Sequence, residues 1–284
     1  MLECVPNVSE GRDHTVLDDL AAACGDALLD RHVDADHHRS VFTLARAGAH
    51  DDTGAAMRSL AVAVAGRVDL TGHAGVHPRL GALDVVPFVA LTGSDRGDAI
   101  DAARAFANWA ADTLALPVFF YDAADSEART LPAARRDAFR TRAPDVGPSR
   151  PHPSLGAVAV GARDPLVAVN CELACDDLTL ARAIATRVRE RDGGLPGVRA
   201  LGLHLDSAGR AQVSMNLVAL ERTGLQDACR AVEALARDAG TSVARVELVG
   251  LLPAAELARC DDEFRVWSGV GPDDTIEARV ARLQ

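Results

Sequence analysis

The sequence predicts an α+β fold built from two ferredoxin-like subdomains, each with the element order β-α-β-β-α-β. Apolar residues make up 48% of the chain and aromatic residues only 4%, as in small-residue helices packed on sheets. Segments with strand periodicity and segments with helical periodicity also follow one another in the same order twice. We therefore expect mixed or antiparallel sheets in the two halves, with a cleft between them.

The first half contains one complete set of these elements. Ser9 and Asp13 offer caps for its first helix, and Asp51 and Asp52 begin its second. An additional helix and strand follow the set. The expected strands are 2–6, 27–33, 40–45, 83–91 and 117–121, and the expected helices are 15–24, 51–68 and 98–114.

The second half repeats the order, with a turn at 206–209 between its middle strands. Its expected strands are 166–173, 198–205, 211–217 and 242–249, and its expected helices are 178–191 and 225–239. Between the halves, 141–165 contains five prolines and three glycines, which argues against a helix or a regular strand ladder. We interpret it as a linker on the surface or in the cleft. The expected domains are residues 1–164, with the linker 141–164, and residues 165–284.

Charge and composition exclude several classes of protein. The net charge is −11 and no basic tract occurs, so neither nucleic acid nor a membrane is an expected partner. All thirty basic residues are arginine, which excludes mechanisms that need a lysine amine. Six scattered cysteines make no CxxC motif and predict reduced thiols. With no signal-peptide pattern at the N-terminus, we expect a cytoplasmic protein.

The densest group of reactive side chains lies in the glycine-rich segment 72–84. Gly75 and Pro78 argue against a helical metal site formed by His73 and His77. Pro78 also favours an extended backbone at His77. This imidazole is either a structural loop residue or a general acid and base, since it titrates near neutral pH.

A second cluster, 32–39, lies in the turn between two expected strands. It predicts a metal site, a wall facing an anion, or only a solvated polar turn. Three arginines lie at strand edges or in loops: Arg39, Arg79 and Arg163. A guanidinium group in such a place could bind a carboxylate in a bidentate contact. On an acidic chain, such a local pocket would be needed to hold an anionic substrate.

Several of these motifs together resemble the glutamate formimidoyltransferase (formiminotransferase) family. They cover about residues 2–257 in the family's order. The matching segments are 3–11 (ECVPNVSEG), 75–88 (GVHPRLGALDVVPF), 117–121 (PVFFY), 156–163 (GAVAVGAR), 211–217 (AQVSMNL) and 247–251 (ELVGL).

The resemblance implies transfer of a formimino group from N-formimino-L-glutamate to N5 of tetrahydrofolate, in histidine degradation and one-carbon metabolism. It implies a homodimer and no metal, without the fused cyclodeaminase domain of animal members, whose activity would come from a separate protein. The family's catalytic histidine falls on His77. The expected substrate-binding residues are His38, Arg39, Arg79, Asp84 and Arg163. The family's folate-contacting segment falls on Pro148, Ser149, Arg150, Pro151, His152, Pro153, Ser154, Leu155, Gly156 and Ala157.

The chain departs from the family pattern at a few positions and leaves alternatives open. Ala74 and Val76 replace a basic and an acidic residue, and His32 and His38 replace Asp and Asn of animal members. A different donor such as N-formylglutamate, or a folate-binding protein without catalysis, is therefore an alternative. A further one is a metal-dependent hydrolase or deaminase with ligands from His32, Asp34, His37, His38 and His73.

Overall fold

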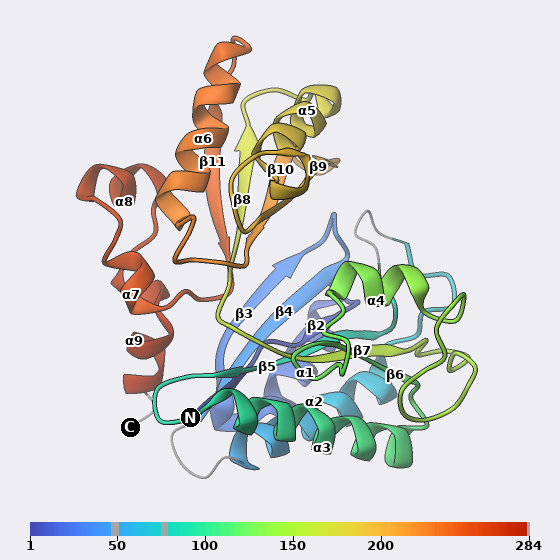
Figure 1. Cartoon of the computed structure of the whole chain (residues 1–284). Helices are drawn as coiled ribbons and strands as arrows, with labels where there is room; N and C mark the ends of the chain where they lie inside the picture. Colours follow the sequence, from blue (N-terminus) through green and yellow to red (C-terminus); the bar gives the residue numbers. More distant parts are fainter. Residues whose placement is uncertain (47–50, 75–78, 283–284) are drawn as a thin grey trace. The chain divides into compact units, whose positions relative to one another are not determined.

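The chain divides into two compact units, Met1–Asp164 and Pro165–Arg282. The computed structural model describes residues 1–46, 51–74 and 79–282 (Figure 1). None of the helices in these ranges is long and apolar enough to cross a membrane.

The first unit contains a seven-stranded mixed sheet. β1 and β2 each pair antiparallel with β4 on one side and β5 on the other, and β3 pairs with β4. This β3-β4-β1/β2-β5 order is that of a ferredoxin-like sheet, and the parallel strands β7 and β6 extend it beyond β5. The elements are β1 (Leu2–Cys4), β2 (Asn7–Val8), α1 (His14–Cys24), β3 (Leu28–Asp34), β4 (Arg39–Ala45), α2 (Asp51–Arg67), β5 (Leu83–Ala90), α3 (Arg96–Leu114), β6 (Val118–Asp122), α4 (Leu131–Asp137) and β7 (Val158–Arg163).

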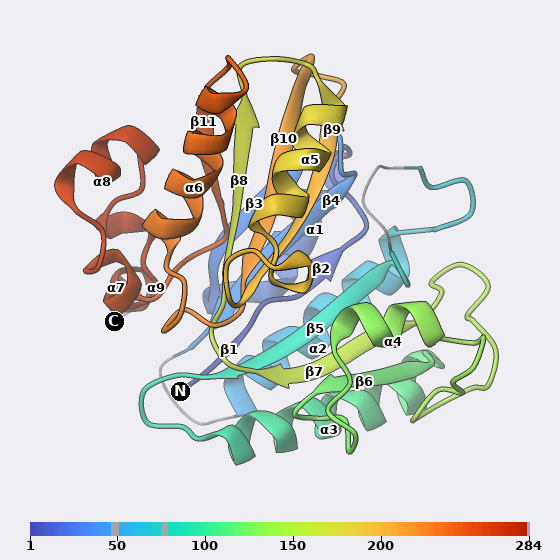
Figure 2. The same ribbon diagram turned by 45° about the horizontal axis from the view of Figure 1, so that its top comes forward.

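Helices cover both faces of this sheet, but unequally. The main core lies between the sheet and α1, α2 and α3, and includes the fully buried Phe42, Leu60, Phe88 and Phe106. The single short helix α4 packs on the opposite face over β6 and β7 (Figure 2). Burial of large apolar side chains on the first face is the main source of this unit's stability.

The interpretation of 141–165 as a linker without regular structure is wrong for its last part. Val158–Arg163 forms β7, which lies between β5 and β6 inside the sheet. Pro153 and Pro165 lie on either side of this strand and no proline lies within it. Its nearly continuous apolar run fits a strand that is buried between two parallel neighbours. Gly161 is required here, because a Cβ would lie 2.5 Å from the ring of Tyr121.

The second unit contains a four-stranded antiparallel sheet in the ferredoxin-like order β11-β8-β10-β9. α5 and α6 cover one face of it, as the second view shows (Figure 2). The predicted α+β class and the predicted repeat are confirmed. Its elements are β8 (Val167–Leu173), α5 (Leu178–Val188), β9 (Val198–Leu205), β10 (Arg210–Leu217), α6 (Leu225–Asp238), β11 (Val243–Val249), α7 (Ala254–Leu257), α8 (Asp262–Ser268) and α9 (Ile276–Ala281).

The sequence reading missed α4 and the last three helices. These helices have only four to seven residues, too short for a clear periodic pattern. Local caps define two of them, since Asp261 accepts from the N–H of Phe264 and Thr275 from that of Ala278.

Candidate active site

The loop between α2 and β5 is held at both ends by the proline-rich segment that precedes β7. The N–H of Leu70 donates to the carbonyl of Ser154 (2.8 Å), and the N–H of Ala82 donates to that of Leu155 (2.9 Å). Ala157 in turn donates to Leu80 (3.2 Å). Two predicted site segments, 72–84 and 148–157, are thus brought together within the first unit.

Two glycines make this close approach possible. A Cβ on Gly81 would lie 1.9 Å from the carbonyl oxygen of Ala157, and Gly156 has a positive φ of 69° beside the carbonyl of Leu80. Neither position accepts a larger residue without movement of the backbone. The motif at 3–11 also reaches this loop, since Ser9 donates from Oγ to the carbonyl of Gly81 (2.8 Å) and from N to that of Ala82 (2.7 Å).

His152 organises the turn that grips the loop. Its Nδ1 accepts from the N–H groups of Leu155 (3.1 Å) and Ser154 (3.4 Å). Because these donors are backbone amides, Nδ1 carries a lone pair and the ring proton is on Nε2. Just before the turn, residues 148–151 are exposed and accessible to a ligand.

The turn between β3 and β4 contacts the same loop through His38. Its Nδ1 lies 2.8 Å from the carbonyl oxygen of Ala74, and its Nε2 lies 3.2 Å from Oε1 of Glu10. The ring also stacks on His73, with centroids 3.8 Å apart and planes 15° from parallel. Gly11 permits this arrangement, since a Cβ there would lie 2.3 Å from the carbonyl oxygen of Asp34.

Glu10 is the anchor of this contact. Its Oε1 accepts the backbone N–H groups of Gly11 (2.8 Å), Arg12 (2.7 Å) and Asp13 (3.0 Å). Partial burial opposes ionisation of this carboxyl, but these N–H groups and the charge of His38 outweigh it and lower the pKa of Glu10. Glu10 is therefore a fixed negative charge beside His38.

A group of arginines surrounds the buried carboxylate of Asp84, at the start of β5. Asp84 accepts the N–H of Leu80 (2.5 Å) and forms an ion pair with Arg135 of α4. Its side chain is 2% exposed. Arg39 and Arg79 both lie in its electrostatic field. Arg135 therefore contacts this carboxylate directly, and Arg39 and Arg79 lie within reach of its charge.

Burial acts on two of these arginines. It lowers the pKa of Arg39 to about 10, although Asp84 and Asp34 oppose the shift. Burial likewise lowers the pKa of Arg79.

Other predicted site residues lie elsewhere. Arg163 is paired with Val89 on β5, five residues and about 17 Å along the strand from Asp84. Its Nη1 donates to the carbonyl of Asp164 (3.0 Å). His77 lies outside the described residues. Asp84 lies beside the arginines, and its oxygens contact the N–H of Leu80 and the guanidinium group of Arg135.

The proposed metal ligands of the hydrolase alternative do not form a common centre. Asp34 pairs with His37 (Oδ2 to Nδ1, 3.3 Å), His38 contacts Glu10, and His32 lies on β3. Within ranges 1–46, 51–74 and 79–282, no group of three or more His, Cys, Asp or Glu side chains is placed to hold a metal ion.

The sequence reading missed two residues of this region. Arg135 lies on the unpredicted helix α4, and nothing in its local sequence relates it to Asp84, 51 positions earlier. Glu10 stands within the first family motif, where its position before Gly11 was the available signal.

These features define a two-unit α+β protein whose first unit gathers histidines, arginines and a proline-rich turn around one loop. Residues 1–163 match the model of the formiminotransferase domain, N-terminal subdomain, and residues 168–266 match that of the formiminotransferase domain. The chain belongs to the formiminotransferase family.

Curated relatives are similar over most of the chain. A glutamate formimidoyltransferase of Streptococcus pyogenes serotype M1 is 36% identical, with 90% of each chain covered. One of Thermoplasma acidophilum is 32% identical, with 99% of this chain and 98% of the relative covered. The formimidoyltransferase-cyclodeaminase of Sus scrofa is 35% identical over 90% of this chain, which spans 51% of that relative.

Proposed function

We propose that the protein is a glutamate formimidoyltransferase, which moves a formimino group from N-formimino-L-glutamate to N5 of tetrahydrofolate. The observation that carries this proposal is that two sequence-distant family motifs contact the described ends of the loop 70–82. Ser9 of the motif 3–11 donates to Gly81 and Ala82, and the turn 152–157 bonds to Leu70, Leu80 and Ala82. These motifs lie in one unit, beside an arginine cluster suited to a carboxylated substrate.

The chemistry requires two proton transfers. N5 of tetrahydrofolate attacks the amidine carbon and forms a tetrahedral adduct. N5 must then lose a proton, and the departing glutamate nitrogen must gain one before its bond to carbon breaks. We assign both transfers to His77, since one imidazole can accept and return a proton near neutral pH.

Arg39 and Arg79 are the proposed holders of the donor's carboxylates. Both lie near Asp84, whose own oxygens are occupied by Leu80 and Arg135. Asp84 therefore acts by positioning Arg135 and Leu80 instead of by contacting substrate. Arg163, the last residue of β7, is a candidate for a different carboxylate, such as that of the folate glutamate.

The proposed folate-binding segment is 148–157. Its first four residues are exposed, and His152 is fixed with Nε2–H as its remaining donor. A rigid turn of this kind binds a ligand with little loss of conformational entropy.

The assay follows formation of 5-formiminotetrahydrofolate by its absorbance, with purified protein, tetrahydrofolate and formiminoglutamate. We expect turnover, and a fall in kcat of about 10²–10⁴-fold for His77→Ala with tetrahydrofolate binding retained. The control is His204→Ala, which removes a half-buried histidine of the edge strand β9 that is paired with Asp206, and it should leave kcat unchanged.

Other outcomes separate the alternatives. Turnover with N-formylglutamate and tetrahydrofolate, but not with formiminoglutamate and tetrahydrofolate, would identify a different donor. Tetrahydrofolate binding without transfer to it would identify a folate-binding protein. Retained turnover in His77→Ala would contradict the assigned role. Loss of turnover after chelation, restored by a divalent metal, would favour the metal-dependent alternative.

We also propose a cytoplasmic homodimer that works beside a separate cyclodeaminase. The support is the family membership and the match to the transferase part of the bifunctional relative. Analytical ultracentrifugation tests the dimer; a monomer at micromolar concentration would contradict it.

A further inference from the structure

Strand β9 forms an outer edge of the sheet in the second unit, beside β10 (Figure 2). The N–H of Val218 donates to the carbonyl of Gly197 (2.8 Å). Because the bonded pairs of an antiparallel ladder alternate, the backbone groups of Ala200, Gly202 and His204 must point away from β10. Within the part of the chain that the structure describes, no hydrogen bond reaches the N–H groups of these three residues. They are therefore available to a further strand.

Three other described strands lie at sheet edges, and each is protected against such pairing. β3 and β11 contain a register shift and several charged side chains. β6 is covered by the chain that follows α4, since the N–H of Val118 donates to the carbonyl of Val146 (2.9 Å). In contrast, β9 keeps a regular register with β10 along its whole length, and its central residues 200–203 include neither a charge nor a proline.

The side chains of β9 give this edge an apolar face. Ala200 belongs to the core under the helices, and a Cβ on Gly202 would lie 2.4 Å from the backbone nitrogen of Arg182 in α5. Side chains alternate along a strand, so Leu201 and Leu203 point to the opposite face of the sheet. Leu201 is 46% exposed and is one of three large apolar side chains exposed in the described ranges. An exposed apolar edge of this kind is stabilised by burial against another strand.

We propose that β9 pairs antiparallel with β9 of a second copy of the chain, about a two-fold axis at Gly202, and joins the two sheets into one. In this register Ala200 pairs with the partner's His204, and Gly202 pairs with the partner's Gly202, so each outward N–H faces a carbonyl. Leu201 then lies opposite the partner's Leu203. All the matching groups come from one strand, as an interface between identical chains requires. The inference rests on the proposed homodimer and not on the proposed reaction.

The first test is sedimentation equilibrium of the full-length protein and of Leu201→Arg. We expect the natural protein to be a dimer at micromolar concentration. The dimer Kd of Leu201→Arg should rise at least about 100-fold, because two leucine contacts are lost in each dimer and a charge replaces each of them. Val266→Arg is the matched control, since it replaces an apolar side chain of α8 that is 85% exposed, and it should leave Kd unchanged.

The second test reads the register by cross-linking the double variant Leu201→Cys/Leu203→Cys, with oxidised glutathione as the oxidant. Residues directly opposite in a non-hydrogen-bonded pair have Cα atoms about 4.5 Å apart, a distance that a disulfide can span. On a non-reducing gel we expect a covalent dimer of the double variant. Neither single variant should form one, because each cysteine would face a leucine. The natural protein, with its six free cysteines, is the control.

The outcomes separate this surface from the other proposals. A natural protein that is a monomer at micromolar concentration would overturn the homodimer and this inference together. A dimer with the same Kd in the natural protein and Leu201→Arg, or a double cysteine variant that forms no covalent dimer, would overturn the β9 surface alone. The assay for 5-formiminotetrahydrofolate decides the proposed reaction independently of either result.

Discussion

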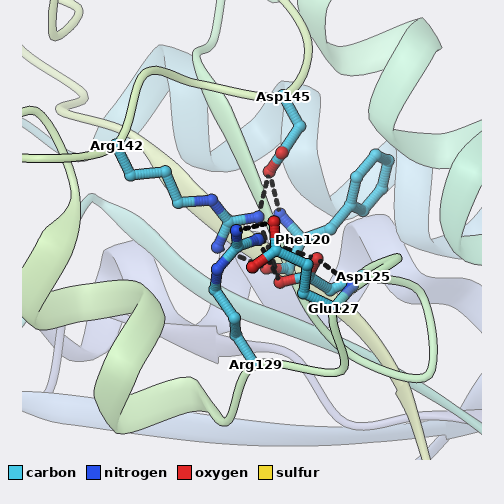
Figure 3. Close-up of polar contacts among 6 residues, drawn as sticks. All are labelled: Phe120, Asp125, Glu127, Arg129, Arg142 and Asp145. Atoms are coloured by element: carbon cyan, nitrogen blue, oxygen red, sulfur yellow. Dashed lines mark hydrogen bonds and ion pairs between the residues drawn. The ribbon is translucent and has the colours of Figure 1, made fainter.

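Two clusters in the first unit consist of the same kinds of side chain, aspartate and arginine, but differ in their role. The cluster at the end of β6 contains Asp125, Glu127 and Asp145 against two guanidinium groups, Arg129 and Arg142 (Figure 3). The cluster at the start of β5 has three guanidinium groups, including Arg135, around the carboxylate of Asp84.

In the β6 cluster, the polar groups are directed at one another. Arg129 donates to both oxygens of Asp125 (3.0 and 3.1 Å), and Arg142 donates to Asp145 (2.6 Å) and to the carbonyl of Phe120 (3.0 Å). Asp145 also accepts the N–H of Phe120 (2.7 Å). These bonds attach the start of the proline-rich segment to β6, as Figure 3 shows, so this cluster is structural.

The difference teaches that charge balance separates a structural network from a candidate binding site. Where carboxylates match or outnumber guanidinium groups, each arginine has an anion from the protein itself. Around Asp84, burial lowers the pKa of Arg39 to about 10, although Asp84 and Asp34 oppose the shift. A carboxylate of a ligand beside Arg39 would oppose this effect of burial further.

The largest effect is expected from Asp125→Asn. Its carboxylate is 2% exposed, so its removal leaves Arg142 and Arg129 without their shared anion. We expect a loss of about 3–5 kcal/mol in the free energy of unfolding, measured by urea denaturation, with kcat/KM of the folded enzyme unchanged. The side chain of Arg129 is 29% exposed. We therefore expect Arg129→Gln to lower the free energy of unfolding by at most about 1 kcal/mol. A fall in kcat/KM for folded Asp125→Asn would remove the distinction between the clusters.

The next effect is expected from Arg39→Gln. Loss of a charged hydrogen bond to a carboxylate costs about 1.5–3 kcal/mol, which corresponds to a rise of about 10–100-fold in the KM for formiminoglutamate. Arg163→Gln is the matched comparison, and we expect it to leave this KM nearly unchanged. An equal rise for both variants would show that the arginines beside Asp84 are not what binds the donor.

The smallest effect concerns acid stability. Burial alone would raise the pKa of Asp125, but the N–H of Glu127 and the charges of Arg129 and Arg142 lower it. Its contribution to stability is therefore present above the unfolded value, about 3.9, and is lost as pH falls through the lower folded value. The stability difference between the natural protein and Asp125→Asn should shrink as pH falls below about 4 in urea titrations. A difference that stays constant would contradict the assigned shift.

Periodicity was sufficient to predict most of the fold. The long helices α2 and α3 and the hairpin strands β9 and β10 have clear apolar patterns, because each buries one face against a layer of the same unit. Strand β7 was not predicted, because the prolines that precede it led to the interpretation of the whole segment as a linker. The helices α4, α7, α8 and α9 were missed because each is at most two turns long.

The motifs at 3–11, 72–84 and 148–157 are marked in the sequence by their glycines, prolines and histidines. Proline fixes φ and glycine permits backbone conformations that other residues avoid, wherever they occur. By itself the sequence therefore determined the α+β repeat and the family, and it marked the segments that we propose form the site. Only the tertiary structure decided that His38 faces Glu10 and that Arg135 pairs with Asp84, because such contacts depend on which strands and loops become neighbours. Hydrogen bonds and ion pairs act over a few ångströms in space, and spacing along the chain does not record that distance.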